Sequence, residues 1–365
     1  MDKTINALGL MSGTSMDGID ASIMISDGER NIDIKGNLYL KYDSELKNAL
    51  HDFCKKINSL QDIKNNQIEY NRLERKITIK HSEIASKICK KFSFNPNIIG
   101  FHGQTILHKP DKKYSIQMGN PNLMSQLLKK NIICQFRKND IENGGEGAPL
   151  TPIYHHYLKK KLNIRKPIIF LNIGGIANLT FSKSDIFLAS DVGPGNCLMD
   201  NYLKKTKKID YDNNGDIASS GKIDNSLINS ILDHQFYNSQ KKHSYDIKDF
   251  DINFVKGLSI HDAMANLNYF TAKTISENIK NFVKDEYSII LCGGGRKNLK
   301  LVSNIKSLLN HEIKNIDEYG IDGDFIESQA FAYLAIRSLL KKNITFPSTT
   351  NVKKAITGGE LIKFI

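Results

Sequence analysis

One local pattern occurs twice in this sequence and constrains its fold more than any other feature. An apolar strand runs into a turn of glycine and small polar residues and then resumes as a second apolar strand. The first copy is INALGLMSGTSMDGIDASIMIS, from Ile5, and the second is KPIIFLNIGGIANLTF, from Lys166. Strand, turn and strand that recur about one domain length apart predict two similar domains, each opening on a glycine-containing hairpin.

The remaining sequence alternates between short apolar runs and helical stretches. Such alternation is typical of α/β sheets covered by helices. The glycine-rich loop NGGEGAPLTP separates the two copies of the pattern, so we expect domains of residues 1–145 and 146–365. The main elements expected between the turns are a helical block from Asp43 to Phe92, buried strands in IIGFHGQTILH and NIICQF, and a final helix in DGDFIESQAFAYLAIRSLL.

Charge and cysteine content narrow the classes of partner. The formal charge is +12, with 51 basic and 39 acidic residues, but the lysine pairs are scattered and are mostly not interleaved with aromatic residues or arginine. This distribution favours a solvated surface and argues against a nucleic-acid partner. Five cysteines without a CxxC pair argue against a disulfide framework or a zinc site. No apolar run has the length of a membrane span, so the sequence predicts a cytoplasmic protein without a membrane partner.

Four glycine turns follow apolar strands, at Gly13, Gly174, Gly193 and Gly293. Such turns present backbone N–H groups to one point, which suits the oxygens of a phosphate. A plain hairpin is the alternative for any one of them, and for CGGGRKN close helix packing explains the glycines equally well as an approach to a ribose or flat ring. The sequence contains neither a P-loop nor the dinucleotide fingerprint GxGxxG.

Several polar residues stand where ligand contacts collect. Asp191 follows an apolar strand and suits a general base, the alternative being a helix cap. Asp17 and Asp20 flank Gly18, and one of them is a candidate to hold Mg²⁺ through water, although Asp17 also suits a turn-stabilising role. His102, Gln104, Arg137 and Asp140 lie at strand ends, and each taken singly is more typical of a structural polar group.

Motifs along nearly the whole chain resemble one family. GLMSGTSMDGID, GFHGQTILHKP, GGEGAPLTP, LNIGGIANLT, SDVGPGNCLMD, LCGGGRKN and DFIESQAFAYLA occur in the order and spacing of the anhydro-N-acetylmuramic acid kinases. This resemblance implies two similar ribonuclease-H-like domains of the actin and hexokinase type, with ATP held in a cleft between facing turns. It also implies hydrolysis of the 1,6-anhydro ring of anhydro-N-acetylmuramic acid and phosphorylation of O6, a step of peptidoglycan recycling, by a homodimer.

The resemblance also assigns roles to individual residues. Asp191 matches the family's catalytic base, which we expect the N–H groups of Gly193 or Asn196 to support. Glu327 matches a sugar contact. Our own chemical inference adds Arg137 for the lactyl carboxylate, and Gln104 and His102 for the hydroxyl and N-acetyl groups. The residues implied for ATP binding are Gly13, Thr14, Ser15, Met16, Asp17, Gly18, Ile19, Asp20, Gly174, Gly175, Asn178, Gly293, Gly294, Gly295 and Asn298, with Mg²⁺ at Asp17 or Asp20.

Three departures from the family pattern stand out. Glu146 replaces a usual glutamine, QFR lacks an acidic residue before FR, and the ending TGGELIKFI diverges. Two other functions remain open at this point. Another amino-sugar kinase of the same fold would use Asp191 on a sugar hydroxyl, and a chaperone-like regulatory ATPase would phosphorylate no small molecule.

Overall fold

The computed structural model describes residues 4–232, 250 and 252–365, and its chain forms two compact units. The first unit comprises residues 1–163 and 325–365, and the second comprises residues 164–324. This division corrects the predicted boundary after residue 145. Helix α6 (Pro152–Lys161) and the C-terminal segment belong to the first unit, because the apolar helix α12 (Ile326–Leu339) packs on the first sheet.

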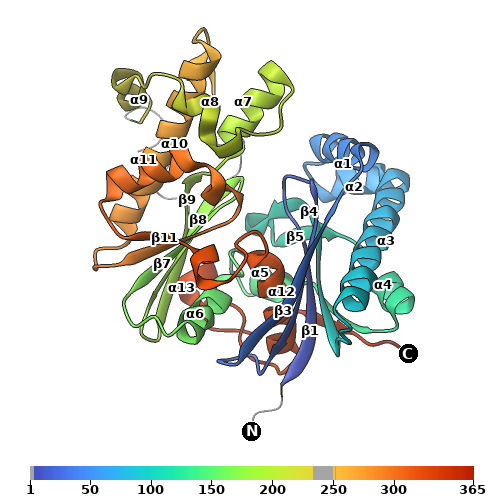
Figure 1. The fold of residues 1–365 in the computed structure, drawn as a ribbon. Coiled ribbons are helices and arrows are strands. Elements are labelled where there is room, and N and C mark those ends of the chain that lie inside the picture. The colour runs from blue at the N-terminus through green and yellow to red at the C-terminus, as the bar shows by residue number, and fades with distance from the viewer. Residues whose placement is uncertain (1–3, 233–249, 251) are drawn as a thin grey trace. The chain divides into compact units, whose positions relative to one another are not determined.

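The first unit is built on a seven-stranded sheet (Figure 1). Its strand order is β12-β6-β4-β1-β2-β3, and β5 pairs with β4. β1, β2 and β3 form an antiparallel meander, whereas β4 runs parallel to β1, and β6 runs parallel to β4. The strands are β1 (Ile5–Ser12), β2 (Gly18–Ser26), β3 (Ile32–Lys41), β4 (Ile98–Lys109), β5 (Tyr114–Met118), β6 (Asn131–Cys134) and β12 (Glu360–Ile362).

Helices cover both faces of this sheet. One face carries a core in which Leu8 and Leu10 of β1 pack among residues of α1 (Ser44–Lys56) and α3 (Gln67–Lys91), which form the predicted helical block. The other face carries α12, whose Ser328 hydroxyl lies 2.6 Å from that of Ser22 on β2. The remaining helices of the unit are α2 (Leu60–Asn65), α4 (Pro121–Leu128), α5 (Lys138–Glu142) and α13 (Pro347–Thr350).

Two glycines of the sheet allow α12 to pack closely against it. Gly9 of β1 and Gly100 of β4 are paired neighbours in the sheet. A Cβ atom on Gly9 would overlap the Ser328 carbonyl and the Ala332 amide, and one on Gly100 would overlap the Phe331 carbonyl. The helix backbone therefore rests directly on the strands, which brings the first turn of α12 close to the sheet.

The second unit repeats the arrangement with a five-stranded sheet in the order β11-β10-β7-β8-β9. β7, β8 and β9 form the antiparallel meander, and β10 and β11 continue in parallel. This order matches β6-β4-β1-β2-β3 of the first unit strand for strand, so the prediction of two similar α/β domains is confirmed. The strands are β7 (Ile168–Ile173), β8 (Ile176–Lys183), β9 (Ile186–Pro194), β10 (Ser288–Cys292) and β11 (Ile313–Asn315).

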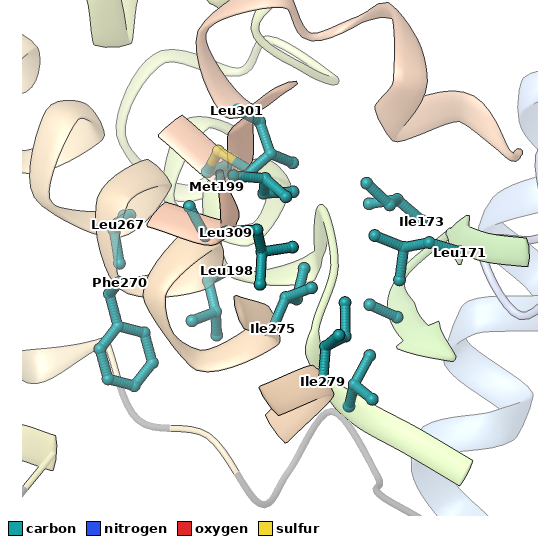
Figure 2. Packing of buried hydrophobic residues seen from close by; sticks show 14 of the residues in the cluster. Leu171, Ile173, Leu198, Met199, Leu267, Phe270, Ile275, Ile279, Leu301 and Leu309 are labelled. Carbon is teal, nitrogen blue, oxygen red and sulfur yellow. The ribbon is translucent and has the colours of Figure 1, made fainter. Parts of the chain in front are cut away.

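A large apolar cluster lies in the core of this unit. Figure 2 shows Leu171 and Ile173 of β7 facing the side chains of α7 (Cys197–Lys207), α10 (Ile260–Phe282) and α11 (Leu299–Leu309). Leu267 and Ile275 of α10 fill its centre with no exposed surface. The other helices described in this unit are α8 (Asp216–Ser219) and α9 (Asn225–Ile231). Among the described residues, no helix has the length and apolar character needed to cross a membrane.

Candidate functional site

The first predicted phosphate turn joins β1 to β2 through residues 13–17. Thr14 and Ser15 are exposed, whereas Met16 is buried and takes a positive φ of 55°. The Met16 N–H donates to the Gly13 carbonyl at 3.1 Å. Around the point where a Cβ of Gly13 would lie, the nearest atom is the Ser15 hydroxyl at 3.9 Å. The backbone at the start of the turn is therefore open to a ligand on the side of Gly13.

Gln104 forms hydrogen bonds with this turn and with the end of β1. It is fully buried, its Oε1 lies 2.6 Å from the Ser12 hydroxyl, and its Nε2 donates to the Gly13 carbonyl at 3.0 Å. Sequence reasoning placed Gln104 on the sugar. In the structure both ends of its amide are engaged by the turn and the strand that leads into it.

Asp17 and Asp20, the candidate Mg²⁺ ligands, lie in different surroundings. The Asp17 carboxylate forms an ion pair with Lys47 of α1 at 2.5 Å, and its carbonyl accepts from the Tyr39 hydroxyl at 3.0 Å. Asp20 lies within β2, opposite Met11 of β1. Mg²⁺ needs only one or two carboxylates when phosphates and water complete its shell. The Asp17 carboxylate is therefore already paired with a cation, and the prediction of Mg²⁺ at Asp17 or Asp20 stays open.

His102 and Arg137 form one hydrogen-bonded pair in the first unit. The His102 Nδ1 lies 2.8 Å from the Gly103 carbonyl, and its Nε2 accepts from the Arg137 guanidinium at 2.9 Å. Burial, and then the charge of Arg137, hold the pKa of His102 well below its ordinary value, so the ring stays neutral. Both ring nitrogens are used internally, so His102 supports Arg137 where sequence reasoning expected a sugar contact.

Arg137 keeps its charge although it is partly buried. It also donates to the Gly147 carbonyl at 2.7 Å. Burial lowers the pKa of Arg137 to about 10, opposed by the charges of Glu327 and Asp140, so the guanidinium is positive at neutral pH. Glu327 lies in the first turn of α12, and its charge acts on Arg137. The structure therefore groups Arg137, His102 and Glu327, three of the four predicted substrate contacts.

Asp140 and Glu146 hold the glycine-rich loop. The buried Asp140 carboxylate accepts from the Gly147 N–H and from the Thr350 hydroxyl, both at 2.7 Å. Glu146 accepts from the Asn351 side chain at 2.7 Å. Asp140 thus has the structural role that we considered more typical, and the unusual Glu146 has a partner in the C-terminal segment. The divergent ending supplies β12, which pairs with β6.

The second predicted phosphate turn, Gly174–Gly175, is braced by the segment that begins α7. The N–H groups of Gly195 and Asn196 donate to the carbonyls of Gly175 and Gly174, at 2.9 and 2.8 Å. The Asn196 N–H is therefore engaged by the turn, and of the two donors expected to support Asp191 the Gly193 N–H stays a prediction. Near Gly174 itself, a Cβ would meet only the Ile176 carbonyl, at 3.5 Å. This turn is open at one glycine, like the turn at Gly13.

Asp191 lies within β9, which continues to Pro194, and not at the end of a strand as we expected. Its partner across the sheet is Asn178 of β8. Directly opposed residues in a sheet share one face, so the predicted base and the predicted ATP contact Asn178 project together. The neighbours Ala177, Leu179 and Val192 belong to the apolar core, which places Asp191 and Asn178 on the opposite face.

The glycines of CGGGRKN have different roles. A Cβ on Gly293 would overlap the Asn172 side chain, and one on Gly295 would overlap Ile173, so close packing explains these two. Gly294 has nothing within 4 Å of that point. Asn298, a predicted ATP contact, is buried and caps α11, since its side chain accepts from the Leu301 N–H at 3.0 Å. Only Gly294 of this motif is open in the way a nucleotide contact requires.

Sequence reasoning missed Arg296, which fixes this loop in place. Its side chain is 2 % exposed, bonds Asp317 at 2.7 Å and also contacts Asp324, and donates to the Gly293 carbonyl at 3.0 Å. The sequence did contain a signal for this cluster, because the segment DEYGIDGD, which follows Arg296 along the chain, contains several carboxylates. What the sequence could not give was their convergence on one guanidinium.

The Arg296 cluster predicts a stability that depends on pH. Burial raises the pKa of Asp317 and Asp324, but the hydrogen bonds and charge of Arg296 outweigh it, so each pKa is lowered. A lowered folded-state pKa stabilises the fold above the unfolded pKa of about 3.9 and loses that effect as the pH falls through the folded value.

Arg296→Met should therefore reduce the free energy of unfolding most at neutral pH, and its difference from the parent should shrink as the pH falls from about 5 towards 2. Urea unfolding across that range measures it. Lys297→Met is the control, because Lys297 is 60 % exposed and contacts Asp324 only from the surface. A constant difference at every pH would contradict the assignment.

Sequence comparison identifies the family. The profile described as anhydro-N-acetylmuramic acid kinase matches residues 5–363. The chain belongs to this family. A member of the anhydro-N-acetylmuramic acid kinase family from Pelagibacter ubique (strain HTCC1062) is 50 % identical over 373 residues and is aligned over the whole of both chains. The enzyme of that name from Zymomonas mobilis is 34 % identical over 363 residues, which cover 97 % of this chain and 99 % of that one.

Solved structures add little to this assignment. The activator of the 2-hydroxyisocaproyl-CoA dehydratase from Clostridium difficile, with bound ADPNP, aligns with a TM-score of 0.44 and 14 % identity. The alignment covers 93 % of this chain and all of the other. At that score the likeness carries no argument, and membership of the anhydro-N-acetylmuramic acid kinase family rests on the sequence.

Proposed function

We propose that this chain uses ATP to cleave the 1,6-anhydro ring of anhydro-N-acetylmuramic acid and to phosphorylate O6, giving N-acetylmuramic acid 6-phosphate and ADP. The observation that carries the proposal is the family match, which spans almost the entire chain with 50 % identity to a relative of that name. In this proposal the protein acts in peptidoglycan recycling, in the cytoplasm, as a homodimer.

The nucleotide would bind at the glycine turns. Gly13, Gly174 and Gly294 support this placement, because each has open space where a side chain would otherwise stand. The exposed Thr14 and Ser15 hydroxyls add donors for phosphate oxygens. Mg²⁺, when bound, would be held through water by Asp17 or Asp20 and would neutralise phosphate charge. Gly293 and Gly295 contribute by packing the loop and Asn298 by capping α11, which leaves Gly294 to face the nucleotide.

The sugar would be held by the first unit. Arg137 is partly buried and keeps a positive charge, which suits the lactyl carboxylate that distinguishes a muramic acid from glucosamine. His102 fixes its orientation through the Nε2 contact, and the neutral ring adds no competing charge. Glu327, whose charge acts on Arg137, would accept a hydrogen bond from a sugar hydroxyl.

Asp191 acts as the general base in this scheme. It takes a proton from water as the water oxygen attacks the anomeric carbon, and the bond from that carbon to O6 breaks. O6 then forms its bond to the γ-phosphorus of ATP, and the bond between that phosphorus and the β–γ bridging oxygen breaks to release ADP. Ring opening and phosphoryl transfer are coupled, because the leaving alkoxide of one step is the nucleophile of the other.

The test is a reaction of the purified chain with Mg·ATP and anhydro-N-acetylmuramic acid in ¹⁸O-labelled water. We expect ADP release that depends on the sugar, and a phosphorylated product that carries one label at C1. A phosphorylated product without label would favour an intact amino sugar as the substrate. ADP release at the same rate with and without sugar would contradict the kinase proposal.

A further inference from the structure

Gln104 lies wholly buried beneath the β1–β2 turn, in a place where a polar side chain is costly unless every group is bonded. Its Nε2 donates to the Gly13 carbonyl at 3.0 Å and to the Thr105 carbonyl at 3.3 Å. Its Oε1 lies 2.6 Å from the Ser12 hydroxyl. The amide is therefore satisfied at both ends, within β4 itself and at the root of the turn.

The contacts of Ser12 fix which way this amide points. Ser12 accepts from the Tyr42 hydroxyl at 3.1 Å and lies 2.9 Å from the Gly18 carbonyl. The Gly13 carbonyl can only accept, so the NH₂ group of Gln104 must face it and the oxygen must face Ser12. Gln104 contacts the Gly13 carbonyl and Ser12, and Ser12 in turn contacts the Gly18 carbonyl. These contacts connect Gly13 at the start of the loop to Gly18 at its end.

This attachment orients the peptide between Gly13 and Thr14. In a planar trans peptide the carbonyl and the following N–H point in opposite directions. The Gly13 carbonyl accepts from the Gln104 amide and from the Met16 N–H, so the Thr14 N–H points away from these donors, to the side where Thr14 and Ser15 are exposed. That is the orientation in which a backbone N–H binds an anion.

We propose that Gln104 is a positioning residue for the phosphate groups of the nucleotide, which acts by holding the Gly13–Thr14 peptide with its N–H outward. The inference rests on the proposed function, since it assigns that turn to phosphate. It also differs from the expectation that Gln104 contacts the sugar, and the two assignments predict opposite outcomes.

The test compares Gln104→Met with Gln329→Met. Methionine keeps the length of the side chain and removes both hydrogen-bonding ends. Gln329 is an equally buried glutamine of α12 in the same unit, which accepts from the Tyr154 hydroxyl at 2.8 Å and donates to the Asn37 side chain at 3.5 Å. Calorimetric binding of ADP and of adenosine, without sugar, is measured for the parent and for both variants, together with thermal unfolding.

We expect Gln104→Met to weaken ADP about tenfold, the effect of one lost hydrogen bond to a charged ligand, and to leave adenosine affinity within about twofold. Gln329→Met should change neither affinity, although it lowers the unfolding temperature. A purely structural defect would weaken both ligands or neither. The KM for ATP should rise while the KM for the sugar stays constant.

Two results would overturn the inference. Unchanged ADP affinity with a raised KM for the sugar would return Gln104 to the sugar site, and equal losses for ADP and adenosine would reduce it to a folding role. If Gln104→Met does not fold, Ser12→Ala replaces it, with a smaller loss of ADP affinity expected in the same pattern. A parent that binds no nucleotide would overturn the proposed function as well, which separates the two failures.

Discussion

Asp191→Asn is expected to lower kcat for sugar-dependent ADP formation by about 10²- to 10⁴-fold, the usual contribution of a general base. Asparagine keeps the size of the side chain but cannot take a proton from water. Because Asp191 and Asn178 project from the same face of the β8–β9 pair, the substitution leaves two amides on one face and should not disturb the core behind it. ATP and sugar affinities should therefore remain close to those of the parent.

The control is Asp224→Asn in the same unit. Asp224 caps α9 by accepting from the Leu227 N–H at 3.0 Å, and asparagine is an equally good cap. We expect this variant to keep parental activity. Mass analysis of the product in ¹⁸O-labelled water gives the decisive reading. If Asp191→Asn still forms labelled sugar phosphate at the parental rate, Asp191 is not the base.

The repeated strand, turn and strand pattern predicted more of the fold than any other feature of the sequence. It predicted two similar domains, and the sheets share their strand order. The domain boundary was wrong, because sequence order does not show which sheet a late helix will cover. α12 follows the second unit in the chain but packs on β1, β2 and β4 of the first.

The candidate site shows the same limit at the level of side chains. Short motifs identified the turns, since glycine and hydroxyl residues after an apolar strand have few other uses. They did not separate residues that face a ligand from residues that hold the turn. Gln104 and Asn196 both stand in motifs, yet their groups bond the backbone of Gly13 and Gly174. Distinguishing the two roles requires the partners of each atom, which lie far away in the sequence.

The second large effect is expected where α12 packs on the strands of the first sheet. Gly9→Ala and Gly100→Ala should each lower the free energy of unfolding by about 3 kcal/mol or more, because the added methyl overlaps backbone that cannot move aside as a side chain would. Ala332 and Phe331 of α12 must then shift away from the sheet.

Gly13→Ala is the matched control for these substitutions, because the same methyl at the end of the same strand meets only the Ser15 hydroxyl at 3.9 Å. Urea unfolding of the three variants should give two strongly destabilised proteins and one that is close to the parent. The shift of α12 also carries Glu327 with it, so the two destabilised variants should lose affinity for the sugar even where they remain folded. Parental stability in Gly9→Ala would mean that α12 does not rest on the strand backbone, and the inferred link between this packing and the sugar contact of Glu327 would fail.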